Sequence, residues 1–333
     1  REISAVHILD NRKRARQEKI GRNVGRDDLQ HGKFQFLKIK KIRGKIMQNI
    51  TNGILDVTVN ENGSLLDSVK YRGEEYLWQG SEKSWKSKDI VIFPFVARLK
   101  DGWYTVDGKR YEMKNHGLAR YNVFTAESNT GDTLVMDFKS TEETKKQYPF
   151  DFDFKVKYAL VGNSMKITYT VVNTGDVDMP FGLGTHFGWA LVGDETDDTC
   201  DVSGNFAIID TDKPIEEYEF DDDLHLVKGE KKSEFTNKIP LVKSTFIHDA
   251  VVTKNNAKKV TLLRRDGKEI TFDIGNVPVL AIWSNNKMGK YACIEAWWGL
   301  PDTVDCDREL KNKFLINTLP AGKTFEYEVT VTF

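Results

Sequence analysis

The stretch FDFDFKVKYALVGNSMKITYTVVNTG, residues 150–175, indicates what kind of fold this chain adopts. Phe150, Phe152 and Phe154 alternate with charged residues, and side chains two positions apart in a β-strand lie on the same face of a sheet. A Gly-Asn pair then precedes a second alternating run, MKITYTVV, as is typical of two antiparallel strands joined by a tight turn. The segment therefore predicts a long β-hairpin with one buried face.

Other segments repeat this pattern. Asn-Gly or Asp-Gly, which favours hairpin turns, separates two short alternating runs at 54–71, 103–113 and 258–274. The final segment, KTFEYEVTVTF at 323–333, predicts one more strand, whereas SEKSWKS at 81–87 predicts at most one or two helical turns. Many short strands without a Gly-rich nucleotide loop indicate an all-β sandwich or barrel.

Charge is distributed unevenly along the chain. Residues 1–46 contain fourteen Lys and Arg against five Asp and Glu, so the formal net charge of −1 leaves about −10 for the remainder. A domain with this net negative charge has no general attraction to nucleic acid or to anionic membranes. The basic segment is either a nucleic-acid-binding arm or an extension outside the fold. We favour the extension, because blocks of like charge usually remain solvated, and we predict a single domain at 47–333.

The longest apolar runs, IVIFPFVA and VPVLAIW, have the length of strands rather than of membrane spans, and no secretion signal precedes Met47. Cys200, Cys293 and Cys306 lie far apart and form no Cys-x-x-Cys pair, which favours a reducing cytoplasm over a disulfide framework or a zinc site. The acidic segment EEYEFDDDLHL, residues 216–226, lacks the spacing of a calcium loop, so we expect a solvated loop.

Three ionisable residues lie within strongly apolar segments: Arg98 in IVIFPFVARL, His186 in MPFGLGTHFGWAL and Glu295 in YACIEAWWGLPD. Such groups are costly to bury unless they are paired or hydrogen-bonded. Each of these residues, taken alone, also has an ordinary structural explanation. For His186 taken alone we favour a buried core histidine whose hydrogen bonds are satisfied. The apolar neighbours of Glu295 should raise its pKa, which favours proton transfer. The residues thus indicate an acid–base set, although spacing alone does not bring them together.

Four motifs resemble the aldose 1-epimerase (galactose mutarotase) family, and more particularly its bacterial LacX-like branch. HGLAR at 116–120 matches the pattern His-Gly-Phe-Ala-Arg, and FPFVARL at 93–99 matches a segment ending in a sugar-binding arginine. GTHFGWAL at 184–191 lies where the family has the motif Gly-x-His-Pro-x-Phe. CIEAWWGLPD at 293–302 lies where the family has a Cys-x-Glu-Pro-Trp motif that ends in Pro-Asp. The resemblance covers about 52–333 and implies a large antiparallel β-sandwich, the supersandwich.

The resemblance also implies roles for individual residues. Glu295 would be the general base and His186 the general acid, while Arg98 and His116 would hold sugar oxygens. Asp249, in FIHDAVV, resembles the family's substrate-binding aspartate. The family needs no metal or cofactor.

Two positions depart from the family pattern, and one residue has two interpretations. Phe187 and Ala296 replace the prolines that follow the acid and the base, so we expect changes in geometry and rate rather than in identity. Arg120 would brace the HGLAR turn or meet a substrate anion, and we favour bracing. Strand packing is the expected role of most tryptophans, and the ones considered for covering a sugar ring are Trp189, Trp297 and Trp298.

The leading prediction is a mutarotase that interconverts the α and β anomers of a hexose such as galactose. A hexose-6-phosphate mutarotase, recruiting Arg120, and a non-catalytic carbohydrate-binding sandwich remain alternatives. A glycoside hydrolase pairing Glu295 with Asp302 or Asp249 would leave His186 without a role. We expect a monosaccharide as the partner, neither nucleic acid nor membrane, and a monomer or homodimer.

Overall fold

The computed structural model describes residues 40–42, 45–196, 199–285 and 289–333. The chain divides into two units, Arg1–Phe36 and Leu37–Phe333, and every described residue belongs to the second. Most of the expected basic extension at 1–46 therefore lies outside the described residues. Within it, β1 (Lys40–Ile42) and the start of β2 (Lys45–Thr51) are paired strands, so strand pairing begins before Met47.

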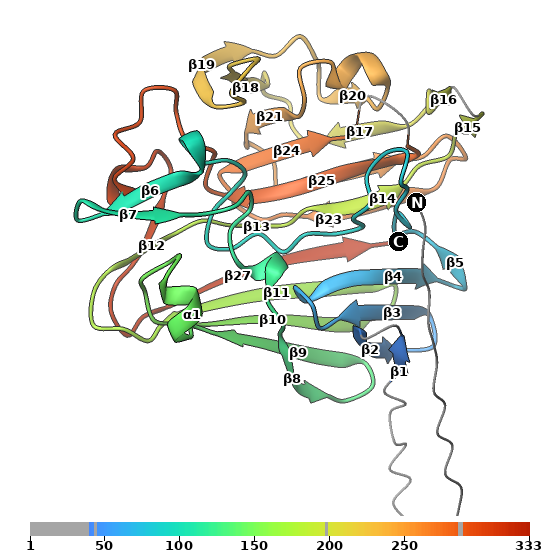
Figure 1. The fold of residues 1–333 in the computed structure, drawn as a ribbon. Helices are drawn as coiled ribbons and strands as arrows, with labels where there is room; N and C mark the ends of the chain where they lie inside the picture. The colour runs from blue at the N-terminus through green and yellow to red at the C-terminus, as the bar shows by residue number, and fades with distance from the viewer. Residues whose placement is uncertain (1–39, 43–44, 197–198, 286–288) are drawn as a thin grey trace, which may run out of the picture. The chain divides into compact units, whose positions relative to one another are not determined.

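The predicted long hairpin lies in the interior of the larger sheet, with further strands on both sides of it (Figure 1). β10 (Phe152–Val161) pairs along its whole length with β11 (Ser164–Asn173), and buried residues alternate along both strands. The last strand of the chain pairs with β11, and β9 pairs with the other edge of β10. In sheet order the remaining strands are β20 (Lys238–Pro240), β17 (Phe206–Ile209), β22 (Lys259–Leu263), β23 (Glu269–Asp273) and β27 (Thr324–Thr332) on one side of the hairpin, and β9 (Thr133–Lys139) and β8 (Thr125–Asn129) on the other.

The second large sheet is built around β25 (Tyr291–Trp298), in which every residue except the last is buried. A strand covered on both faces reads as a continuous apolar run, which explains why its sequence does not alternate. One face packs on the larger sheet, where the ring of Trp189 lies 5.5 Å from that of Phe272. The other strands of this sheet are β13 (Leu183–Gly184), β14 (Phe187–Ala190), β18 (Glu216–Phe220), β19 (Val227–Lys232), β21 (Val251–Lys254) and β24 (Val279–Trp283).

The remaining elements are small. A five-stranded sheet consists of β1, β2, β3 (Leu55–Asn60), β4 (Leu65–Tyr71) and β5 (Glu74–Glu75). Two-stranded pairs join β6 (Trp103–Val106) with β7 (Lys109–Glu112), β12 (Met179–Phe181) with β26 (Asn317–Leu319), and β15 (Asp194–Glu195) with β16 (Cys200–Asp201). The described helices are α1 (Glu142–Lys145) and the 3₁₀ turns η1 (Lys100–Gly102), η2 (Ala119–Tyr121), η3 (Lys243–Phe246) and η4 (Leu310–Asn312).

The all-β prediction and the predicted hairpins are confirmed, because β3 pairs with β4, β6 with β7 and β22 with β23. SEKSWKS at 81–87 forms no helix, which is within the predicted limit of one or two turns. One local prediction is wrong, because residues 216–220 of the acidic segment are strand β18 rather than loop. Tyr218 and Phe220 alternate with glutamates, a spacing typical of a strand, and the net acidity obscured that pattern. Among the described residues, no helix is long and apolar enough to span a membrane.

Candidate active site

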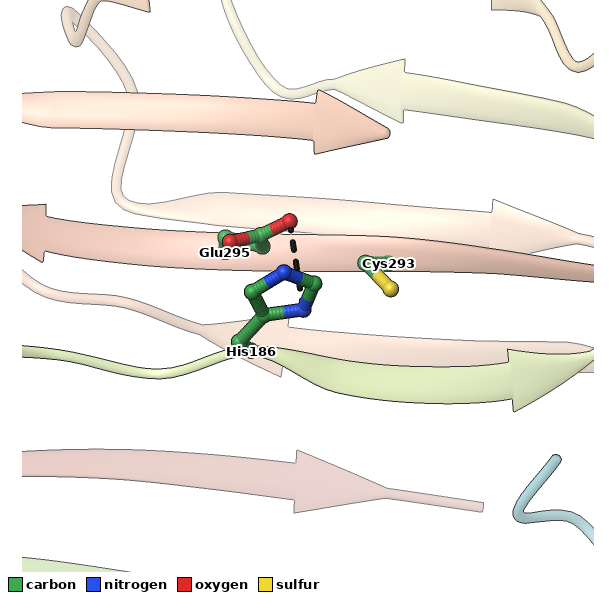
Figure 2. Close-up of side chains that lie close together, drawn as sticks. All are labelled: His186, Cys293 and Glu295. Atoms are coloured by element: carbon green, nitrogen blue, oxygen red, sulfur yellow. Dashed lines mark ion pairs between the residues drawn. The ribbon is translucent and has the colours of Figure 1, made fainter. Parts of the chain in front are cut away.

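His186 and Glu295 lie side by side in the second sheet, His186 just before one strand and Glu295 on its neighbour (Figure 2). His186 immediately precedes β14, Glu295 lies on β25, and the pairing of Phe187 with Ile294 sets their register. The His186 Nδ1 and Glu295 Oε1 atoms are 3.5 Å apart, with 7% of His186 and 1% of Glu295 exposed. Nδ1 makes no hydrogen bond with any described residue, so the pair is in contact but its geometry is not that of a formed hydrogen bond.

Burial favours the uncharged form of both side chains. It lowers the pKa of His186 to about 3, with a further contribution from the charge of Arg120. It raises the pKa of Glu295 well above its ordinary value, although a hydrogen bond from Trp297 opposes the shift. At pH values between the lowered pKa of His186 and the raised pKa of Glu295, the two side chains together hold one proton. The titration therefore belongs to the pair rather than to either residue.

Aromatic rings enclose the pair. The Trp85 ring stacks on His186 at 5.1 Å and 23°, and Trp283 meets His186 edge-on at 5.5 Å and 79°. Trp297 Nε1 donates to Glu295 Oε2 at 3.1 Å. Of the tryptophans singled out from the sequence, only Trp297 touches the pair. Trp189 and Trp298 pack in the core against Phe272 and Phe325.

His116 lies beside His186, with ring centroids 5.2 Å apart. The Ala97 amide donates to His116 Nδ1 at 3.3 Å, so the proton of the neutral ring is on Nε2. Burial and the nearby His186 hold the pKa of His116 well below its ordinary value. Gly117 is required here, since its φ is +77° and a Cβ would collide with the Phe93 carbonyl. The glycine thus brings the turn against its neighbouring segment and places His116 next to the pair.

Arg98 and Asp249 line a cavity of about 610 Å³, a size typical of ligand pockets. The Arg98 side chain is exposed and forms no hydrogen bond or ion pair with a described residue. His186 and Glu295 do not line this cavity. Trp283 joins the two, because its ring contacts His186 and its Nε1 donates to Asp249 Oδ1 at 2.6 Å.

Arg120 does not pair directly with a carboxylate of the described residues. Its guanidinium lies over the Tyr121 ring, 5.1 Å from the centroid, and burial lowers its pKa. The nearby Asp89 favours the charged form of Arg120 and is itself buried, with a pKa raised to about 7 by desolvation. Arg120 acts on the site through its field, which lowers the pKa of His186.

One of the two departures from proline, Ala296, has a structural counterpart in Thr185. The Thr185 amide donates to the Ala296 carbonyl, and the Ala296 amide donates to Thr185 Oγ1, both at 3.0 Å. Proline at 296 would lack that second donor. This reciprocal contact joins the residue before His186 to the residue after Glu295, and so fixes the separation of the pair.

If His186 and Glu295 are the acid–base pair for sugar anomerisation that the motifs imply, Thr185→Val should lower kcat about tenfold while changing KM less than about twofold. The substitution leaves the buried Ala296 amide without an acceptor, at a cost of about 1–3 kcal/mol. Thr185→Ser retains the hydroxyl and should behave as the wild type. Polarimetry and urea denaturation of both variants would test this. A Val variant that is less stable but has an unchanged kcat would limit Thr185 to a structural role.

Cys293 lies near the pair, and donor atoms of Cys293, His186 and Glu295 lie within 4.8 Å of one another (Figure 2). These are the described residues best placed to hold a metal ion. Burial raises the pKa of the Cys293 thiol well above its ordinary value. A metal would therefore have to displace protons from both Cys293 and Glu295, so the chemistry of this donor set favours a pair that works without a metal.

The fold and this site define a class of antiparallel β-sandwich proteins in which a buried His–Glu pair adjoins a polar, aromatic-lined cavity. The chain belongs to the aldose 1-epimerase family, whose model matches residues 47–332. The resemblance inferred from the four motifs is thereby confirmed.

Known relatives agree with this assignment. The chromosomal protein LacX of Lactococcus lactis subsp. lactis is 26% identical over 295 residues, covering 85% of this chain and 98% of LacX. A galactose mutarotase related enzyme from Lactobacillus acidophilus has a TM-score of 0.80 at 31% identity, covering 86% of this chain and 96% of that one. A galactose mutarotase-like protein from Lactobacillus casei ATCC 334 has a TM-score of 0.80 at 25% identity, covering 86% and 99%.

Proposed function

We propose that this chain is a mutarotase, an isomerase that interconverts the α and β anomers of a free hexose by acid–base ring opening and closure. The observation that carries the proposal is the buried His186–Glu295 contact of 3.5 Å beside a polar cavity. Family membership supports a sugar as the substrate. Arg98, His116 and Asp249 are proposed to hold the sugar's other oxygens.

The proposed mechanism conserves protons. In the reactive state Glu295 is a carboxylate and His186 an imidazolium, which differs from the uncharged pair only by transfer of the shared proton. Glu295 takes the proton of the C1 hydroxyl while His186 protonates the ring oxygen, and the ring opens to the aldehyde. Rotation about C1–C2 and closure on the other face reverse both transfers. Because the pair is uncharged while the ring is open, the burial that favours uncharged side chains favours this intermediate.

A free sugar suits the cavity better than a sugar phosphate. Among the described residues that line it, Arg98 is the one with a lysine or arginine side chain, whereas Asp222 and Asp249 contribute two carboxylates. A phosphate dianion would face those two carboxylates with one guanidinium from the described lining to offset them. Arg120, the residue considered for phosphate, is partly buried beside Asp89 and acts on the pair instead.

A glycoside hydrolase would pair Glu295 with a second carboxylate, either Asp302 or Asp249. The structure argues against Asp302. Asp302 is 4% exposed, and its Oδ1 accepts from Lys313 Nζ at 2.6 Å. A carboxylate engaged in this way is a poor nucleophile or base. A purely sugar-binding sandwich, in turn, would have no need of the buried His186–Glu295 contact.

We expect the protein to accelerate the mutarotation of freshly dissolved α-glucose or α-galactose, followed by polarimetry. Exchange of glucose 6-phosphate anomers, followed by NMR, should be accelerated less, since the cavity contains two carboxylates. If the protein binds sugars but accelerates no anomerisation, the mutarotase proposal is wrong and the protein is a sugar-binding protein. Preference for the phosphorylated sugar would overturn the assignment of a free hexose.

A further inference from the structure

Two His–Asp pairs line the large cavity, and they differ in burial. His225 Nδ1 lies 3.6 Å from Asp249 Oδ2, with 34% and 43% of the side chains exposed. His248 Nδ1 lies 3.2 Å from Asp222 Oδ1, with 77% and 74% exposed. The first pair is the more buried of the two, whereas the second makes the shorter contact, a hydrogen bond, but is exposed to water, where such a pair contributes little.

Asp249 makes a hydrogen bond through one carboxylate oxygen and faces His225 with the other. Oδ1 accepts from Trp283 Nε1 at 2.6 Å, and Oδ2 faces His225 Nδ1. Trp283 in turn contacts His186. This chain of contacts runs from His225, on the loop that follows β18, to Trp283, one of the rings that enclose the acid–base pair.

The backbone at both residues is left-handed, with φ of +54° at His225 and +80° at Asp249. A non-glycine residue in this region costs about 1–3 kcal/mol and persists where the surrounding structure holds it, often at ligand-binding sites. The two residues therefore meet across the cavity at some cost in backbone energy. A binding role accounts for that cost better than a solvated loop does.

We propose that His225, oriented by Asp249, is a sugar-binding residue that accepts a hydrogen bond from a hydroxyl remote from C1. His225 Nδ1 faces Asp249 Oδ2 at 3.6 Å, and an Nδ1–H directed at that carboxylate would leave Nε2 as an acceptor. Arg98, on the same cavity wall, donates to a neighbouring hydroxyl. The ligand class is a neutral polyol such as a free aldose. This inference rests on the proposed function and adds to it, since Asp249, proposed above to hold a sugar oxygen, also positions His225.

The test uses three Asn variants, because Asn tolerates a left-handed backbone. His225→Asn and Asp249→Asn should each raise KM about fivefold to tenfold, as expected for one lost hydrogen bond, with kcat within about twofold of wild type. His248→Asn, on the matched exposed pair, should leave both constants unchanged. Sugar dissociation constants measured by calorimetry in a Glu295→Gln background should rise by the same factors as KM.

Each outcome decides the matter. Unchanged KM and dissociation constants in His225→Asn, or equal losses in His248→Asn, would overturn the role of His225 while leaving the mutarotase assignment intact. A wild type that binds hexoses without turning them over would end the mutarotase proposal, and the dissociation constants would still test His225. A wild type that neither binds nor converts a hexose would overturn both.

Discussion

Glu295→Gln should lower kcat for hexose mutarotation by about 10²–10⁴-fold, the usual contribution of one general acid or base. Gln has nearly the shape of Glu but takes no proton from the C1 hydroxyl, and its amide can still accept from Trp297. His186→Asn, which removes the proposed acid, should cause a loss of similar size. Polarimetry at saturating sugar measures both. Normal kcat in both variants, with intact folding, would end the assignment of the pair.

The same substitution should make the protein more stable above pH 5. The unfolded Glu295 ionises near its ordinary pKa of about 4.3, whereas burial keeps it protonated to a higher pH in the folded protein. As pH rises above the unfolded value, the unfolded state loses a proton that the folded state retains, so the stability of the wild type falls until the folded pKa is passed.

Gln does not titrate, so the difference in Tm between variant and wild type should be smallest near pH 4 and grow toward neutral pH. His186 acts in the opposite direction. Its pKa, lowered to about 3, costs the wild type stability as pH falls below 6.5, and His186→Asn should remove that loss. Thermal unfolding of the three proteins between pH 4 and 8 checks both signs. A Glu295→Gln protein whose Tm is lower at pH 8 than that of the wild type would contradict this account.

The regular part of the fold could be predicted from the sequence because its signals are local. The turn residues Asp107 and Gly108 have φ of +48° and +78°, the geometry that an Asp-Gly hairpin turn requires. Strand β25 lacked alternation because both of its faces are covered, so its place in the second sheet could not be read from periodicity. Order within a sheet depends on pairings such as β11 with β27, which join residues more than a hundred positions apart.

The site was predicted in part. His186, Glu295 and His116 meet, as the four motifs implied, and Arg98 and Asp249 line one cavity. Trp85, Trp283 and Thr185 were missed, because each acts through a contact made only in the folded chain. One signal was available, since a Cβ on Gly188 in GTHFGWAL would lie 2.6 Å from the Trp85 ring. That glycine indicates close approach, but its partner lies about a hundred residues earlier.

Asp302 gives the second large effect, on stability rather than on chemistry. Its carboxylate pairs with Lys313 Nζ at 2.6 Å, with 4% and 5% of the side chains exposed, and its Oδ2 accepts from the Lys100 amide at 2.8 Å. Its own amide donates to the Arg98 carbonyl at 3.0 Å. The buried pair therefore holds the segment that presents Arg98 to the cavity.

Lys313→Met should lower the free energy of unfolding by about 3–5 kcal/mol, since it leaves the Asp302 charge buried without its partner. The double variant Asp302→Asn with Lys313→Met removes both charges and should regain most of that loss. Lys311→Met is the matched control, because Lys311 pairs with Asp107 on the exposed surface and its loss should leave stability unchanged. Urea denaturation measures all three. If the double variant is no more stable than Lys313→Met, the loss of stability comes from lost packing. If the double variant regains stability but has a raised KM, the charged pair also positions Arg98.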